Sequence, residues 1–170
     1  METVTAFHEE LAAQATAQVA AITQGLRPLL ELVRRSIVVT DSNGSASLSN
    51  NLSTDDLQSL AMRIPAECAY IQTRVNDMLI SHSLQVLLTE GEVTQNIQLL
   101  HGAKGDAKER LRRAEAMSQK ELLRDAARQQ TIRALQDYIE RADKVYEGVK
   151  KIIDAKSREF NFDGKPGRPL

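Results

Sequence analysis

Apolar positions recur with the period of a helix along most of the chain. From Pro65 to Leu100 they fall three and four residues apart, and Leu79, Val86 and Val93 continue this stripe at a spacing of seven. The clearest pattern lies further on, and we call its members the C-terminal seam: Ile132, Leu135, Ile139, Ala142, Tyr146, Val149 and Ile153. Steps of three and four predict a coiled-coil-like seam that is used in the core or between copies.

The signals around Ser53 predict the start of a long helix. Ser53 suits the N-cap position, and the acidic residues that follow it suit the positive end of the helix dipole. Leu52 and Leu57 occupy the two positions of a hydrophobic staple. We therefore expect a helix to begin at Thr54. At Pro65 either a short helix ends and another begins, which we prefer because proline suits a first turn, or a single helix kinks.

A short loop predicts that two long helices lie antiparallel. Residues 101–105 contain two glycines, and Asp106 is a good N-cap for the next helix. We expect that helix to run unbroken to Phe160, a length of roughly 80 Å. It would then extend beyond its partner by roughly 30 Å at the same rise per residue. Residues 54–64, the N-terminal helix or another copy must cover this overhang, and we favour self-association.

These elements predict an all-α fold, a long antiparallel helical hairpin with an additional N-terminal helix on a flexible linker. Residues 1–39 form the N-terminal helical segment, with a break near Leu26 because Gly25 and Pro28 interrupt the pattern. The β-branched run at 36–40 suits a short extended exit. The remaining divisions are a flexible linker at 40–53, a helical hairpin domain at 54–160 and a disordered tail at 161–170.

Composition agrees with helical packing and with a reducing compartment. Hydrophobic residues make up 42% of the chain and aromatics only 4%, which suits helix seams better than a β-sandwich. The one cysteine, Cys68, has no partner for an internal disulfide, and its place on the apolar stripe predicts a buried, inert thiol. The N-terminus lacks the features of a signal peptide, and no stretch is apolar enough to cross a membrane. We expect a cytoplasmic protein.

Charge is divided unevenly between the two halves of the chain. Residues 1–100 hold five Lys/Arg against eleven Asp/Glu, whereas residues 101–170 hold seventeen against twelve. The cations that begin the second half form what we call the basic band: Lys104, Lys108, Arg110, Arg112, Arg113, Lys120, Arg124 and Arg128. One interpretation is a solvated helix face, because acidic residues are interleaved and allow pairs such as Glu109–Arg113, Glu121–Arg124 and Asp125–Arg128. The other is a surface for nucleic-acid phosphates.

No residue pattern predicts catalysis or cofactor binding. The three histidines lack the spacing of a metal site; His82 falls on the apolar stripe, where a satisfied core histidine is expected, and His101 falls in the solvated loop. The glycine-containing loop before Asp106 follows no predicted strand and lacks the Lys-Ser/Thr signature of a phosphate-binding loop. We therefore expect a protein that is not an enzyme and that has no metal or cofactor.

The order of elements over residues 53–160 resembles the UvsY-like recombination mediators of tailed phages. The resemblance rests on the capped start Leu52–Leu57, the segment Ile64–Ile71, the loop sequence Gly105–Arg110, the segment Tyr146–Ile153 and the final Arg158-Glu159. It implies a helical, oligomeric protein that binds single-stranded DNA and helps to load a recombinase. It covers about two thirds of the chain and transfers no individual functional residue.

Two hypotheses of function follow. The first is a non-enzymatic, oligomeric accessory of phage-type recombination or replication, which binds single-stranded DNA and contacts a recombinase or a single-strand-binding protein. The second is a structural adaptor or assembly scaffold that acts through coiled-coil helix contacts.

Overall fold

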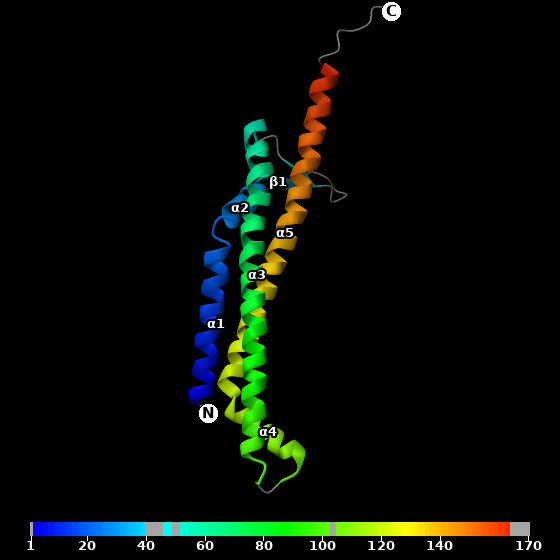
Figure 1. Cartoon of the computed structure of the whole chain (residues 1–170). Helices are drawn as coiled ribbons and strands as arrows, with labels where there is room; N and C mark the ends of the chain where they lie inside the picture. Colours follow the sequence, from blue (N-terminus) through cyan, green and yellow to red (C-terminus); the bar gives the residue numbers. More distant parts are fainter. Residues whose placement is uncertain (1, 40–45, 49–51, 103–104, 164–170) are drawn as a thin grey trace, which may run out of the picture. The chain divides into compact units, whose positions relative to one another are not determined.

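The computed structural model describes residues 2–39, 46–48, 52–102 and 105–163. Its helices and strands are α1 (Glu2–Ile22), α2 (Leu26–Ser36), β1 (Ile37–Val39), β2 (Ala46–Leu48), α3 (Thr54–Leu99), α4 (Ala107–Met117) and α5 (Gln119–Asp163) (Figure 1). The predicted all-α class and the helical hairpin, formed by α3 and α5, are confirmed. None of the helices in the described part is long and apolar enough to cross a membrane.

The N-terminal cap of α3 forms as its sequence predicts. The Asp56 N–H donates to the Ser53 hydroxyl at 3.0 Å, and the Ser53 N–H donates to the Asp56 carboxylate at 3.0 Å. This reciprocal pair is a capping box, which satisfies two backbone donors that a helix start leaves without partners. These hydrogen bonds also hold the pKa of the exposed Asp56 carboxyl below its ordinary value, with the Ser53 hydroxyl as the largest cause. The expected start at Thr54 is therefore confirmed.

Pro65 lies inside α3, so the preferred prediction of a helix end before it is wrong. The helix continues through the proline for 46 residues in all. Leu60, Ile64 and Cys68 are buried on both sides of Pro65. Their packing on one face offsets the single backbone hydrogen bond that proline removes.

A break at Ser118 contradicts the prediction of one uninterrupted helix from Asp106 to Phe160. The Ser118 N–H bonds to the Ala114 carbonyl at 3.2 Å and ends α4, while the Ser118 carbonyl accepts from Leu122 at 3.1 Å and starts α5. Helices α4 and α5, on either side of the break, run in different directions (Figure 1). The Asn96 amide of α3 donates to the Ser118 hydroxyl at 3.0 Å, so a tertiary contact holds the break in place.

The predicted difference in length between the two long helices is absent. Helix α3 includes residues 54–64 and has 46 residues, and α5, shortened by the break at Ser118, has 45. Residues 54–64, one of the three covers considered for the overhang, therefore extend the partner helix. Any proposal of self-association needs evidence other than helix length.

The chain divides into two compact units, each built from segments that are distant in the sequence. The first unit comprises Met1–Ile22 and Thr73–Gln136, and the second comprises Thr23–Gln72 and Asp137–Leu170. The expected break near Leu26 is confirmed, because α1 ends at Ile22 and α2 begins at Leu26. The two N-terminal helices thus belong to different units.

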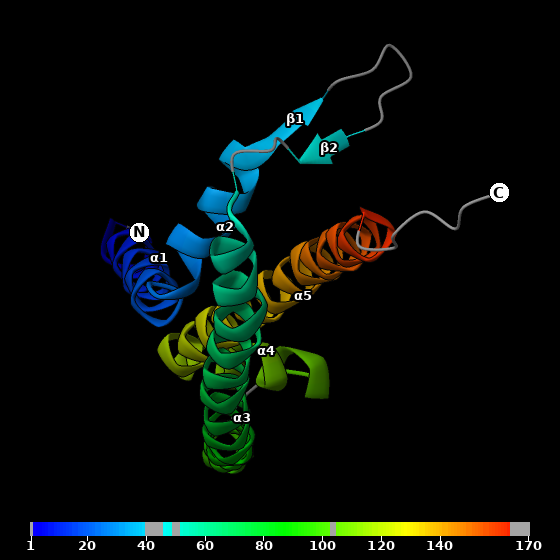
Figure 2. The same cartoon turned by 90° about the horizontal axis from the view of Figure 1, so that it is seen from above.

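The predicted linker and tail fall only partly within the described residues. Positions 40–45, 49–51 and 164–170 lie outside them. Of the predicted linker, Ala46–Leu48 form β2, which pairs antiparallel with β1 so that Ile37 lies opposite Leu48 (Figure 2). The extended exit expected at 36–40 is therefore a strand over residues 37–39.

A continuous apolar core fills the second unit. Helices α2, α3 and α5, together with Leu52 just before α3, supply its buried side chains: Leu26, Leu29, Val33, Leu52, Leu57, Leu60, Ile64, Cys68, Ile71, Ala142 and Val149. Leu52 also fixes the entry to α3, because the Lys156 ammonium of α5 donates to its carbonyl at 3.0 Å. This core holds α2 beside α5, which positions the groove described below.

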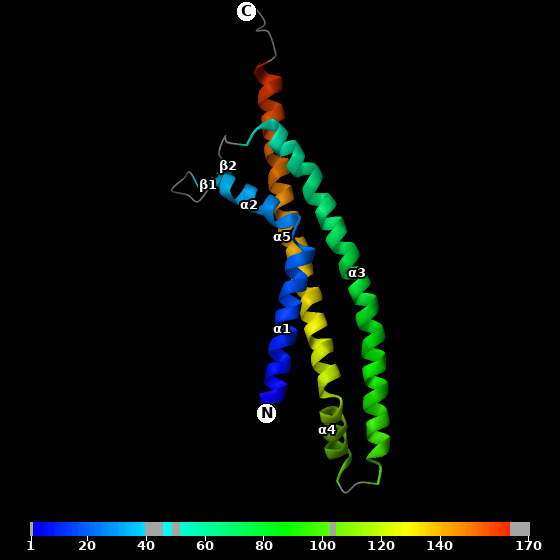
Figure 3. The same cartoon turned by 90° about the vertical axis from the view of Figure 1, so that its left-hand side faces the viewer.

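The first unit has a smaller and more polar interior. In it residues 73–99 of α3 run antiparallel to residues 119–136 of α5, and α1 lies along the same stretch of α5 (Figure 3). Its buried apolar residues are Val75, Ala114, Ile132 and Leu135, and Thr89, Ser118, Asp125 and Thr131 are buried beside them. The predicted N-cap of α4 is confirmed, because the Asp106 carboxylate accepts from the Glu109 N–H at 2.7 Å.

Candidate binding surfaces

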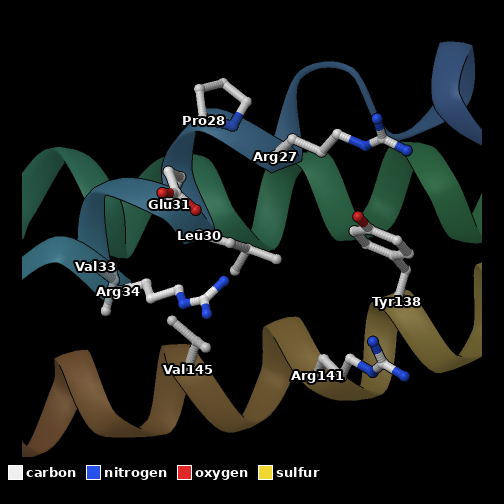
Figure 4. Close-up of a pocket in the computed structure, with 9 residues that line it drawn as sticks. All are labelled: Arg27, Pro28, Leu30, Glu31, Val33, Arg34, Tyr138, Arg141 and Val145. Atoms are coloured by element: carbon white, nitrogen blue, oxygen red, sulfur yellow. The ribbon is translucent and has the colours of Figure 1, made fainter. Parts of the chain in front are cut away.

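A groove in the second unit runs between α2 and α5 and has a volume of about 740 Å³ (Figure 4). We call it the α2–α5 groove. Its described lining residues are Arg27, Pro28, Leu30, Glu31, Val33, Arg34, Tyr138, Arg141 and Val145. On α2, the three- and four-residue steps from Arg27 through Leu30 to Arg34 place these residues on one face of the helix. The groove therefore combines apolar walls with three guanidinium groups.

The arginines of this groove keep most of their charge available. Arg27 donates through Nε to the Thr23 hydroxyl at 3.1 Å, and its guanidinium lies 5.9 Å from the centre of the Tyr138 ring. Neither Arg34 nor Arg141 takes part in an ion pair within the described residues. The one carboxylate of the lining, Glu31, pairs instead with Arg35 outside it. The groove therefore carries a positive charge, although the whole chain carries −1.

These arginines are absent from the predicted basic band. The spacing of Arg27 and Arg34 could have indicated a cationic helix face, because it places both arginines on a different side of α2 from the buried Leu29. The opposite wall, however, is contributed by Tyr138, more than one hundred positions later. A single sequence does not reveal which two helix faces meet at that distance.

The break at Ser118 divides the predicted basic band between two helices. Lys104 lies outside the described residues. On α4, Lys108 and Arg112 are exposed and Arg110 is half-buried, and these three make no ion pair within the described part. Arg113 pairs with Glu109, as expected. The cations of α4 therefore form their own small cluster.

The cations of α5 are engaged more closely with their own chain. Arg124 pairs with Glu121, as expected. The Lys120 ammonium and the Arg124 guanidinium lie 5.9 and 5.6 Å from the centre of the Phe7 ring of α1. The expected Asp125–Arg128 pair is not among the ion pairs of the described residues, and Arg128 is exposed. Part of the basic band thus stabilises the contact between α1 and α5.

The C-terminal seam lies inside the chain for much of its length. Ile132, Leu135, Ala142 and Val149 are buried, and Ile139, Tyr146 and Ile153 are half-buried. Ile132 and Leu135 belong to the first unit, and the other five residues of the seam belong to the second. The seam therefore supplies core contacts within each unit.

A second apolar surface lies on α3 and points away from the interior. Ile80, Leu84, Leu87 and Leu88, which we call the α3 apolar face, are 63%, 59%, 64% and 63% exposed. Steps of four, three and one place all four on one side of the helix. Scattered exposed leucines need no explanation, but a contiguous group of this kind is typical of an interaction surface.

Metal-ligating and thiol groups of the described residues were the remaining candidates for a site. No group of three His, Cys, Asp or Glu side chains among them is placed to hold a metal ion. Cys68 is buried, as expected, and burial, with smaller contributions from Asp143 and Glu67, raises the pKa of its thiol to about 11. His101 is exposed, as expected, whereas His82 is half-buried and its Nδ1 has no partner in the described part, so the expectation of a satisfied histidine is wrong.

No protein-family model matches the chain, and no curated protein or solved structure does so either. The fold and its surfaces define a helical protein with three separate candidate contact regions. These are the α2–α5 groove, the α4 cations and the α3 apolar face.

Proposed function

We propose that this chain is a non-catalytic, self-associating helical protein that binds single-stranded nucleic acid. The observation that carries the proposal is the α2–α5 groove, in which three arginines and Tyr138 line one surface. The resemblance to UvsY-like mediators supports DNA as the ligand and phage-type recombination or replication, in the cytoplasm, as the setting. It also supports a recombinase or a single-strand-binding protein as the protein partner.

The chemistry of the groove suits a single strand better than a duplex. Guanidinium groups bind phosphate oxygens in a bidentate manner and release condensed counterions. A tyrosine ring offers a surface on which an unpaired base stacks without sequence preference. The apolar side chains Leu30 and Val145 shelter the base from water. The exposed Lys108 and Arg112 of α4 supply a second, weaker phosphate contact.

Fluorescence anisotropy with a labelled oligothymidylate, repeated over a range of salt concentrations, tests this proposal. Each phosphate contact to a single strand contributes about −0.7 to the slope of log K against log salt. The double variant Arg34→Gln, Arg141→Gln should therefore flatten the slope by about 1.4. The matched control is Arg63→Gln, Arg133→Gln, which removes the same charge from α3 and α5 outside the groove. Equal effects of the two double variants would show that the groove is not the site.

A further pair of substitutions tests the predicted basic band. Lys108→Gln with Arg112→Gln removes the exposed α4 cations and leaves the groove intact. We expect a smaller loss of affinity than for the groove variant, because two cations without an aromatic neighbour attract phosphates but do not hold a base. Absence of oligothymidylate binding by the unaltered chain even at low salt would exclude the nucleic-acid function altogether.

The α3 apolar face favours a second candidate function, that of an adaptor or scaffold assembled from copies of this chain. Four side chains alone cover less than the ~800 Å² that each partner of a stable complex typically buries. The face is therefore proposed as the centre of a larger contact. Mass measurement in solution at micromolar concentration should show a multimer that Leu84→Glu dissociates, with Leu32→Glu in α2 as the exposed control. A monomeric unaltered chain would remove both self-association and the adaptor function.

A further inference from the structure

A second groove, in the first unit, has the opposite electrostatic character. It lies among α3, α4 and α5, has a volume of about 710 Å³, and we call it the acidic groove. Glu90, Glu115 and Asp125 contribute carboxylates to it, and no lysine or arginine is among the described residues that line it. Clusters of acidic residues are common at protein surfaces. Evidence for a binding site must therefore come from the burial and the hydrogen bonds of the individual side chains.

Asp125 is the most unusual of these side chains, because it is 91% buried. Its Oδ2 accepts a hydrogen bond from the Thr89 hydroxyl at 2.9 Å. Its Oδ1 is buried and has no donor in the described part of the chain. Buried carboxylates are normally paired with a cation or fully hydrogen-bonded, since an uncompensated buried charge is costly. One oxygen of Asp125 therefore lacks the donor that its environment demands.

The other lining residues indicate the kind of donor that fits. The His82 Nδ1 is likewise buried without a partner in the described residues, and it lines the same groove. Val86, Val93 and Leu122 add apolar surface. A hydrated metal ion is a poor match for such walls, and the described residues offer no three-ligand group. An organic cation with an apolar stem satisfies both the carboxylate and the walls.

We infer that the acidic groove binds an alkyl ammonium group, of the kind that lysine side chains and polyamines carry. The ammonium donates to Asp125 Oδ1, and its remaining hydrogens face Glu90 and Glu115 at the rim of the groove. The methylene stem packs against Val86 and Leu122. None of the described residues that line the acidic groove belongs to the basic band, although α4 and α5 contribute to both.

Titration of the full chain with n-butylamine, followed by the backbone amide NMR shifts of Thr89 and Asp125, tests the inference. n-Butanol serves as the neutral probe of similar shape. We expect saturable shifts with the amine and at least tenfold weaker binding of the alcohol. Equal responses to both probes, or none to the amine, would overturn the proposal.

Substitutions locate the binding within the groove. Asp125→Asn keeps the shape and removes the charge, and should weaken amine binding at least tenfold. The control Glu92→Gln removes a carboxylate from α3 outside the lining and should leave affinity within twofold. If Asp125→Asn fails to fold, the double variant Glu90→Gln, Glu115→Gln replaces it and should also weaken binding. Affinities that do not differ from that of Glu92→Gln would overturn the proposal.

Two further probes distinguish the natural source of the ammonium group. Spermidine represents free polyamines, and a short peptide with one lysine, compared with its acetylated form, represents a protein partner. Tighter binding of spermidine than of butylamine assigns the groove to polyamines. Tighter binding of the lysine peptide, abolished by acetylation, assigns it to a partner protein. Failure of both probes to bind would overturn the inference.

Discussion

The two units of this chain use the same helices in different ways. In the second unit, α3 buries large apolar residues such as Leu60, Ile64 and Ile71. In the first unit, the same helix directs Ile80 and Leu84 outwards and buries Thr89. Thr89 continues the buried side of α3, whereas Ile80 and Leu84 lie on the opposite side of the helix, which is exposed in the first unit. The second unit thus has the more extensive apolar core and carries its groove beside that core, whereas the first unit leaves apolar side chains exposed and one carboxylate oxygen without a donor among its described residues.

The largest expected effect is the difference in unfolding free energy between alanine substitutions at two isoleucines of α3, one buried and one exposed. Ile64→Ala should cost about 2–5 kcal/mol of unfolding free energy, because it opens a cavity in a fully packed core. Ile80→Ala should change it by no more than about 0.5 kcal/mol, since Ile80 is 63% exposed. Urea denaturation of both variants below the concentration of self-association measures the difference. Similar losses would mean that the α3 apolar face is covered in the monomer.

A polar contact inside the first unit gives the next largest effect. Thr89→Val removes the donor to Asp125 Oδ2 and should cost about 1–3 kcal/mol, because it leaves a buried carboxylate oxygen unsatisfied. Adding Asp125→Leu should recover most of that loss, since replacing both partners by apolar groups is nearly neutral. Thermal denaturation of the two single variants and of the double variant gives the interaction free energy between the two side chains. Simple additivity would show that the two side chains do not interact.

Helix capping provides a smaller test in the second unit. Ser53→Ala should cost about 1 kcal/mol, because it removes the hydroxyl of the capping box. The hydrogen bonds from Ser53 lower the pKa of Asp56 in the folded state, so their contribution is fully present above the ordinary Asp56 value of 3.8. It is lost as the pH falls through the lower folded value. Stability curves of both proteins should therefore converge in acid, and parallel curves would exclude the linkage.

The smallest effect concerns a single thiol. The raised pKa of Cys68, about 11 against an ordinary 9.0, lowers its thiolate fraction at pH 8 by about 100-fold. Iodoacetamide should therefore alkylate the folded chain at least that much more slowly than the chain in urea. Because the folded pKa is raised, the stabilisation associated with the neutral thiol is present below pH 9 and lost as the pH rises towards 11. Rapid alkylation at pH 8 would show that the second-unit core opens readily.

Local signals in the sequence were sufficient for the fold class and for the helix starts. The caps at Ser53 and Asp106 depend on residues within one turn, and the structure forms both. The burial of Cys68 followed from its place in a stripe with a regular period. Such features are decided by neighbours in the chain, so a single sequence contains them.

Features that depend on distant neighbours were missed. Ser118 has neither proline nor glycine beside it, and the break there is held partly by Asn96, on another helix. The α2–α5 groove could be predicted only with the knowledge that Arg27 faces Tyr138. The sequence allowed a pair of Asp125 with Arg128 in its own helix, whereas the Asp125 carboxylate accepts a hydrogen bond from Thr89, on the antiparallel helix. In each case a contact across helices outweighed the local pattern.

The joint at Ser118 has an electrostatic consequence. The last turn of α4 carries the negative end of one helix dipole, roughly half an elementary charge, and the first turn of α5 carries the opposite end of another. Ser118 brings the two ends together, so their fields largely cancel at this point. The beginning of α5 therefore attracts anions less than an isolated helix start does. Attraction of a phosphate to the start of α5 must therefore come from the side chains of its first turns, such as Lys120 and Arg124.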